Sequence, residues 1–272
     1  LGGYFYVAKP GWPFLAFYFA MLAATFTGAL WRKGTRLWTI PLVSLLAAFW
    51  LVSREPVSTL HILPMAGSPI WVDLKGTRQD LLIDCSNEYG FEFGVQRFLR
   101  AQGVGRLPNL ILTHGDAEHV GGFALAQARF DPRQIYTSPH SSRSPAHRAA
   151  FRTLAEMPQR WKQVSQGDTI IGWQVLHPGE HKFPRADDNA AVLRASIEGW
   201  MVMVIPDLGR DGQRALLESG QDLSANLLVI SAPNSSEPVR EELLERINPK
   251  VTVIGAHSAF ARRNSLADLL KE

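Results

Sequence analysis

Two histidines and two carboxylates stand close together near the middle of the chain and could hold a metal ion. They are His114, Asp116, Glu118 and His119. Imidazole nitrogens and carboxylate oxygens together suit Zn²⁺, Mn²⁺ or Fe, and pairs of metals in particular. The apolar run at residues 110–112 predicts a short buried strand that delivers these side chains at its end. A polar surface turn with two chance histidines is the alternative interpretation.

The spacing of these residues resembles the H-x-H-x-D-H signature of the metallo-β-lactamase fold. It is similar to the H-x-D-x-D-H form in the ComEC family of competence DNA-uptake channels, with Glu118 in place of the second aspartate. Asp84 resembles the family's first acidic motif, which orients the metal-binding histidines. Asp207 stands where the family has a carboxylate that bridges two metals. The resemblance implies metal-assisted hydrolysis, with DNA as the substrate.

Three departures from the family pattern remove polar groups from the expected metal face. Residues 63–68 replace an acidic opening motif, residues 232–235 replace a pair of histidines, and a later Gly-His-Pro is missing near Ala261. His257 follows a predicted strand and is a further candidate ligand. The predicted ligands are His114, Asp116, Glu118, His119, Asp207 and His257, and the candidate catalytic residues are Asp84, Asp116 and Glu118. We expect one divalent ion, Zn²⁺ or Mn²⁺, or none if the motif is a relic of the fold.

This incomplete ligand set leaves two functional hypotheses open. In the first, the domain is a metal-dependent hydrolase, a nuclease acting on incoming DNA with an activated water as the nucleophile. In the second, catalysis has been lost, and the domain guides DNA or has a structural role in the same channel. The sequence contains no Gly-x-Ser-x-Gly motif that would supply a serine nucleophile.

The other side chains with metal affinity are assigned to structure or to the surface. Cys85 is the only cysteine, which excludes an internal disulfide and a multi-cysteine zinc site. It ends an apolar run, so we expect a buried thiol. His177 is expected to be structural. The remaining histidines are expected at the surface: His61, His140, His147 and His181.

Positive charges gather around residues 145–161, a segment that predicts a helix. The charged side chains are Arg143, Arg148, Arg152, Arg160 and Lys162. Phosphate contacts from such a face would be sensitive to salt and independent of base sequence. The net charge of +3 is compatible with a polyanionic partner but does not establish one. The cluster predicts a DNA-binding face, and a solvated helix face is an equal alternative.

Two uncharged runs rich in aromatic residues come first in the chain, at about residues 12–30 and 37–53. A bilayer core needs about 20 apolar residues per helix. The loop between the runs contains Arg32, Lys33 and Arg36, and such a loop lies in the cytoplasm by the positive-inside rule. We therefore expect a transmembrane hairpin over residues 1–56 in the plasma (inner) membrane. A buried hairpin of a soluble domain is the alternative. Because the chain starts at Leu1, we also expect it to be part of a longer protein.

Residues 57–272 are expected to form an α/β domain on the extracytoplasmic face, next to other components of the competence channel. Strands are predicted at residues 59–63, 70–74, 81–83, 110–112, 135–137, 169–176, 190–197, 200–205, 226–231 and 251–254. Helices are predicted at residues 91–102, 145–161, 212–219, 237–247 and 265–270. This order, with acids and histidines at strand ends, fits a two-sheet αββα sandwich of the metallo-β-lactamase type.

Overall fold

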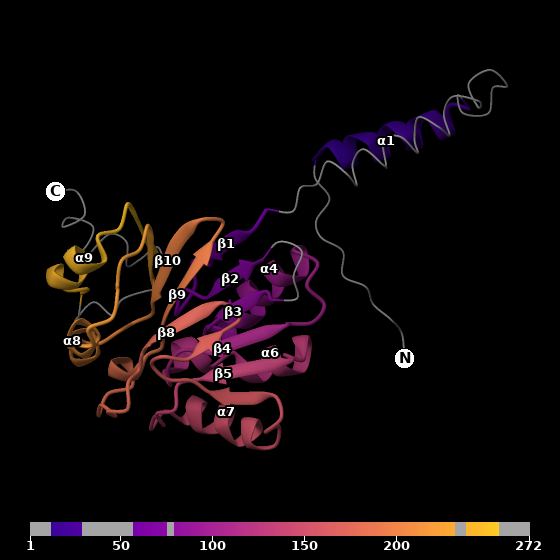
Figure 1. Ribbon diagram of the computed structural model, residues 1–272. Helices are drawn as coiled ribbons and strands as arrows, with labels where there is room; N and C mark the ends of the chain where they lie inside the picture. The colour runs from indigo at the N-terminus through magenta and orange to yellow at the C-terminus, as the bar shows by residue number, and fades with distance from the viewer. Residues whose placement is uncertain (1–11, 29–56, 75–78, 232–237, 256–272) are drawn as a thin grey trace.

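The computed structural model describes residues 12–28, 57–74, 79–231 and 238–255. Two six-stranded sheets form the centre of the fold, with strand orders β1-β2-β3-β4-β5-β6 and β12-β11-β10-β9-β8-β7. In Figure 1 the first sheet is drawn mainly in purple and magenta, and the second mainly in orange and yellow. Each sheet is therefore built from one continuous half of the chain.

The first sheet brings the ends of consecutive strands to one edge. Its strands are β1 (Thr59–Ile62), β2 (Ile70–Asp73), β3 (Leu81–Ile83), β4 (Asn109–Leu112), β5 (Gln134–Thr137) and β6 (Trp161–Gln163). The strands from β3 to β6 pair in parallel, whereas β1, β2 and β3 pair antiparallel. The residues that follow β3, β4 and β5 therefore meet at the same edge. These include Asp84, Thr113 and His114.

The second sheet contributes its own strand ends. Its strands are β7 (Thr169–Ile170), β8 (Trp173–His177), β9 (Val192–Ile197), β10 (Trp200–Ile205), β11 (Leu227–Ser231) and β12 (Val251–Gly255). Strands β7 to β10 pair antiparallel, and β10 to β12 pair in parallel. The ends of β8 and β10 consequently lie at the same edge as the start of β9. Asp207, which follows β10, is placed there.

Neighbouring residues of a strand belong to different apolar cores, because successive side chains point to opposite faces of the sheet. Ile111 packs between the two sheets, while its neighbours Leu110 and Leu112 pack against the helices of the first sheet. In the second sheet Val204 faces the inter-sheet core, and Met203 faces the helices on the other side. Three apolar cores therefore separate four layers, and the predicted α/β sandwich is confirmed.

The helices cover the outer faces of the two sheets. Those on the first sheet are α3 (Glu88–Gly90), the π-turn η2 (Phe91–Val95), α4 (Gln96–Ala101), α5 (Ala117–Val120), α6 (Phe123–Phe130) and α7 (Pro145–Ala155). Those on the second are α8 (Arg210–Glu218) and α9 (Glu241–Ile247), and the short 3-10 turn η3 (Asp187–Asn189) precedes β9. The first group packs against its sheet through Leu99, Phe123 and Leu154. The second group packs through Leu216 and Leu243.

Two predicted elements are wrong in extent. The helix predicted at residues 145–161 ends at Ala155, and β6 begins at Trp161. Pro158 explains the early end, since a proline disfavours helical geometry in the residue before it. The strand predicted at residues 169–176 is the hairpin of β7 and β8. Its turn residues Ile171 and Gly172 have φ values of +52° and +80°, the left-handed geometry of a tight hairpin.

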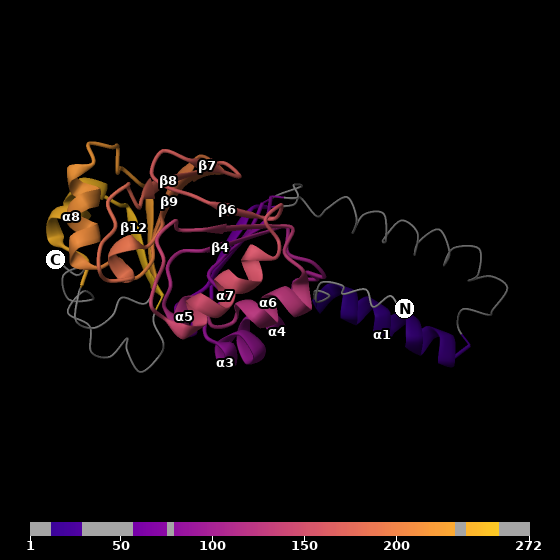
Figure 2. The same ribbon diagram turned by 90° about the horizontal axis from the view of Figure 1, so that it is seen from below.

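The helix α1 (Trp12–Phe26) is the described part of the first predicted membrane span. It contains no charged residue, and it exposes Trp12, Phe19 and Phe26. In the two views of Figures 1 and 2 it lies outside the sandwich. Within residues 12–28 and the other described ranges, no helix has the length and apolarity needed to cross a membrane. The second predicted span, residues 37–53, lies outside the described residues.

Candidate metal centre

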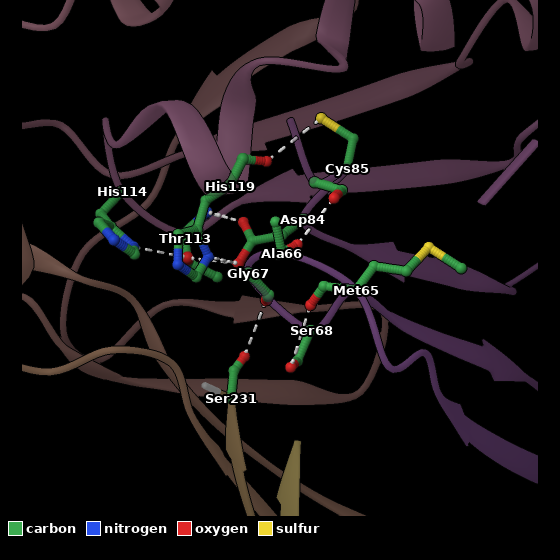
Figure 3. Close-up of polar contacts among 11 residues, drawn as sticks. Met65, Ala66, Gly67, Ser68, Asp84, Cys85, Thr113, His114, His119 and Ser231 are labelled. Atoms are coloured by element: carbon green, nitrogen blue, oxygen red, sulfur yellow. Dashed lines mark hydrogen bonds and ion pairs between the residues drawn. The ribbon is translucent and has the colours of Figure 1, made fainter. Parts of the chain in front are cut away.

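The buried carboxylate of Asp84 fixes the orientation of the second histidine of the motif. One oxygen accepts a hydrogen bond from the Thr113 backbone N–H at 2.8 Å. The other accepts from Thr113 Oγ1 at 2.7 Å and from His119 Nδ1 at 2.8 Å, as Figure 3 shows. Because Nδ1 of His119 donates its proton to Asp84, Nε2 keeps its lone pair for a ligand. Asp84 acts through His119 and is a positioning residue.

His114 presents a buried nitrogen without a partner. Its Nδ1 lies 3.0 Å from Thr113 Oγ1. The single hydroxyl proton of Thr113 is donated to Asp84, so the hydroxyl oxygen accepts from Nδ1–H and Nε2 carries the lone pair. Among the described residues Nε2 of His114 has no hydrogen-bond partner, and the residue is only 4% exposed. An unsatisfied buried polar atom costs about 1–3 kcal/mol, which coordination of a metal would offset.

Potential ligand atoms form two groups around His114. One group combines His114, His119 and Asp207, and the other combines His114, Asp116 and Asp187. Within each group the ligand atoms lie within 4.8 Å of one another. The first sheet supplies the histidines and Asp116, while Asp187 in η3 and Asp207 after β10 come from the second half of the chain. The residues therefore fit a divalent metal ion at the edge where the two sheets meet.

The pKa values of the two histidines are shifted in opposite directions. Burial, together with nearby His119 and His147, lowers the pKa of His114 well below its usual value. Burial by itself would lower the pKa of His119, but the charges of Asp84, Asp207 and Asp116 outweigh it and raise that pKa. For Asp116, burial and then the neighbouring charge of Asp187 raise the pKa.

Two sequence predictions meet a different outcome at this centre, and a third is not tested. Glu118 is exposed on α5 and joins neither group of ligand atoms, because the short helix turns its side chain towards solvent. His147 was expected at the surface, but it is buried and stacks on Phe151. His257 lies outside the described residues. Of the predicted ligands, the structure brings together His114, Asp116, His119 and Asp207.

Asp187 was missed as a candidate ligand. It precedes Asp188 in a pair of acids shortly before β9, and the pair is the only sequence signal that could have drawn attention to it. Two other sequence predictions are confirmed: Cys85 is fully buried, and His177 is buried with its Nε2 2.8 Å from the carbonyl oxygen of Asp188.

The loop at residues 63–68 supports the motif through its backbone. Gly67 has a φ of +68°, and a Cβ added there would lie 2.2 Å from the carbonyl oxygen of Glu118. The Ser86 hydroxyl donates to the carbonyl of Ala66 at 2.7 Å. The Ser231 hydroxyl donates to the carbonyl of Gly67 at 3.2 Å (Figure 3). The loop thus packs tightly under α5, which carries His119.

A cleft of about 460 Å³ opens next to His114. Its lining mixes polar and apolar residues and includes three basic side chains, those of Arg143, Lys182 and Arg185. The other lining residues are His114, Gly115, Ser138, His140, Ser141, Ser142, Phe183, Pro184, Ala186 and Asn189. Lys182 Nζ donates to Ser141 Oγ at 2.8 Å, which links the loop after β5 to the loop after β8. The cleft gives an anionic molecule a route to the candidate metal centre.

The predicted basic cluster is divided in the structure. Arg148 and Arg152 are exposed on α7, and Arg143 precedes this helix and lines the cleft. Arg160 forms an ion pair with Asp131 at 2.5 Å, so its charge is already partly neutralised. Lys162 is exposed on β6. Arg143 is therefore the member of the cluster that lines the cleft.

Comparisons with known proteins agree with the fold. Residues 64–190 match the metallo-beta-lactamase superfamily. The chain is 28% identical over 202 residues to competence protein ComA of Neisseria gonorrhoeae, covering 73% of this chain and 27% of that protein. It is 23% identical over 164 residues to ComE operon protein 3 of Bacillus subtilis (strain 168), covering 58% of this chain and 21% of that protein.

The chain spans about a quarter of the length of these two curated relatives. Among solved structures, the metallo-beta-lactamase from Hirschia baltica is 12% identical with a TM-score of 0.42, and the match covers 71% of this chain and 92% of that one. The chain thus contains a mixed α/β metallo-β-lactamase fold with distant relatives among competence proteins. This fold implies binding of a divalent metal ion.

Proposed function

We propose that residues 57–272 form a metal-dependent hydrolase domain of a ComEC-type membrane protein for DNA uptake. The domain would cleave phosphodiester bonds of incoming DNA. His114 would hold one divalent ion, Zn²⁺ or Mn²⁺, together with the other ligands of one of its two groups. The observation that carries this proposal is the unpartnered Nε2 of buried His114, which faces a second imidazole and a carboxylate.

The residues of the chain have distinct tasks in this proposal. Asp84 holds His119, and Thr113 holds His114, so both imidazoles present Nε2 without rearrangement. Asp116 is close enough to the ligands to accept a proton from a water molecule in the cleft. When bound, a divalent ion supplies an activated water and neutralises charge on a phosphoryl oxygen. A single ion does not supply the paired clamp of a dinuclear site, so we expect slow cleavage.

DNA as the substrate is supported by two independent observations. Both curated relatives are named as competence or ComE operon proteins. The cleft beside His114 is lined by Arg143, Lys182 and Arg185, whose charges suit a phosphate backbone. Other competence components are the expected protein partners.

Direct analysis of metal and cleavage tests the proposal. We expect the full chain in detergent to bind about one divalent ion, and His119→Ala and Asp207→Ala to lower the affinity for Zn²⁺ about tenfold or more. Labelled single- and double-stranded DNA should be cut slowly with a divalent ion, and His114→Ala, which removes the ligand common to both groups, should abolish the cleavage. His181→Ala is the matched control because His181 is exposed. A chain without bound metal, and unaffected by His114→Ala, would contradict the proposal.

A catalytically degenerate DNA-guiding module is the second candidate. It is favoured by the exposed position of Glu118, which leaves a second metal position short of ligands. In that case the chain would bind metal and DNA, but no cleavage would be detected with Zn²⁺ or Mn²⁺.

The membrane location is part of the same proposal. We propose that residues 1–56 form a two-helix hairpin in the plasma membrane, with the loop containing Arg32, Lys33 and Arg36 in the cytoplasm and the domain outside. The support is the uncharged sequence of both runs and the apolar side chains that α1 exposes. A phosphatase reporter fused after Glu272 should be active, because it folds only outside the cytoplasm. Activity only of a cytoplasmic reporter at the same position would overturn this topology.

A further inference from the structure

The two groups of candidate ligands compete for one atom. His114 belongs to both groups, and its Nδ1 already faces Thr113 Oγ1 at 3.0 Å. Only Nε2 remains, and a single imidazole lone pair can coordinate only one ion. Two ions therefore cannot both use His114 at the same time.

The two groups differ in their donor atoms. The imidazole-rich seat consists of His114, His119 and Asp207 and offers two nitrogens and one carboxylate. The carboxylate-rich seat consists of His114, Asp116 and Asp187 and offers one nitrogen and two carboxylates. Imidazole nitrogen suits Zn²⁺, whereas carboxylate oxygen suits Mn²⁺ and Mg²⁺. The two seats are thus built for different ions.

The carboxylate-rich seat is more than a group of surface acids. Asp187 is only 8% exposed, and its ligand oxygen lies within 4.8 Å of that of Asp116. A cation between two such carboxylates would offset the repulsion of their charges. The unpartnered Nε2 of His114, itself buried, lies within reach of both. Asp187 also pairs with Arg185 at 3.2 Å, but the arginine side chain is 48% exposed and can turn into solvent.

We propose that the chemistry of the ion decides where it binds: Zn²⁺ occupies the imidazole-rich seat, Mn²⁺ occupies the carboxylate-rich seat, and each excludes the other through His114. Asp187 is accordingly a ligand of the manganese position only. This inference rests on the metal binding of the proposed function and adds a rule for ion selection. A cell with a changing ratio of the two ions would fill the same cleft in two different ways.

Binding measurements on the full chain in detergent separate the two seats. Mn²⁺ is followed by the loss of its aqueous EPR signal, and Zn²⁺ by competition with a chromophoric chelator. Asp187→Asn should weaken Mn²⁺ about tenfold or more and change Zn²⁺ affinity less than about threefold. Asp207→Asn and His119→Gln should show the opposite pattern. Glu242→Gln is the matched control, since it also removes a carboxylate that pairs with an arginine, at 2.8 Å on the surface.

Each outcome of these titrations has a defined meaning. Wild-type chain should bind Mn²⁺ and Zn²⁺ competitively, with one ion in total. Equal effects of Asp187→Asn on the two ions, or no effect on either, would overturn the two-seat inference and leave metal binding by the imidazole-rich seat intact. Simultaneous binding of both ions would overturn the exclusion through His114. Circular dichroism shows whether each variant is folded. If either Asp207→Asn or His119→Gln does not fold, the other one still tests the imidazole-rich seat. A chain that binds neither ion contradicts the proposed function itself.

Discussion

Each sheet of the sandwich has a buried aspartate at the edge that carries the site, and the two aspartates bind different kinds of groups. Asp84, after a strand of the first sheet, bonds to the side chains of Thr113 and His119. Asp188, before a strand of the second sheet, accepts from the backbone N–H groups of Asp211 and Gly212 at 2.9 and 3.0 Å. The first aspartate therefore orients chemical groups, whereas the second holds the start of a helix.

This difference shows how the centre is assembled. In the first sheet both histidines are already fixed in the tautomer that a ligand needs. In the second sheet Asp187 and Asp207 are placed indirectly, because Asp188 ties η3 to the start of α8 and Asp207 lies shortly before that helix. We expect damage to the contacts of Asp84 to affect metal binding directly through the histidines. Damage to the contacts of Asp188 should lower stability first and should affect metal binding only through the positions of Asp187 and Asp207.

Gly67→Ala changes the loop that packs under α5 of the first sheet and should have the largest effect on stability. The added Cβ would meet the Glu118 carbonyl oxygen at 2.2 Å, and the φ of +68° would be strained as well. We expect a loss of about 3 kcal/mol in the free energy of unfolding, together with weaker metal binding through displacement of α5. Gly199→Ala is the matched control, since its φ is +79° but no atom lies within 4 Å of the added Cβ. It should cost only about 1 kcal/mol. Equal losses in denaturant titrations would contradict the role assigned to this contact.

His177→Gln probes the contacts of Asp188 in the second sheet through the dependence of stability on pH. Burial lowers the pKa of His177 from 6.5 to about 4 in the folded protein. The unfolded chain therefore takes up a proton between these values while the folded chain does not, so stability falls as the pH is lowered from 6.5 to 4. The expected loss is about 2 to 3 kcal/mol, because one pKa unit corresponds to about 1.4 kcal/mol. Glutamine does not titrate, so the variant should lose less stability over this window in parallel unfolding curves. Identical slopes for variant and wild type would show that another group is responsible.

The smallest effect is expected from arginines on the surface of α7, away from the contacts of Asp84 and Asp188. Changing Arg148 and Arg152 to Gln should weaken binding of unrelated DNA sequences alike, by less than about 1 kcal/mol each, and should flatten the salt dependence. Arg160→Gln is the comparison, because Arg160 pairs with Asp131 and should contribute little to the salt slope. Fluorescence anisotropy at increasing salt gives both quantities. An unchanged salt slope in the double variant would show that the exposed side of α7 is a solvated helix face that does not bind DNA.

The strands were predictable because their signals are local. The apolar runs ending at Ile83, Leu112 and Ile205 appear in the structure as β3, β4 and β10, and the acid or histidine after each run reaches the same edge. For β3 and β4 that convergence follows from their parallel pairing, and β10 reaches the same edge from the second sheet. The sandwich and most of the ligand set could therefore be derived from the sequence.

The errors arise where a distant contact decides the outcome. His147 is buried because α7 packs beside the site, and nothing in its neighbours along the chain indicates this. Asp187 becomes a candidate ligand only when the second sheet brings it next to Asp116. Glu118 has the correct spacing for a ligand, but the local helix turns it outward. Spacing along the chain predicts which residues share an edge and leaves their final directions undetermined.

One backbone hydrogen bond has a use of its own. The amide of Ala191, just before β9, donates to the carbonyl of Thr113, just after β4, at 2.9 Å. This amide is buried and its acceptor belongs to the opposite sheet. Its hydrogen can exchange with solvent only when the two sheets part at this edge, so its protection factor measures the free energy of that opening. Hydrogen exchange at this single amide therefore reports how often the two sheets separate locally at the edge that carries the site.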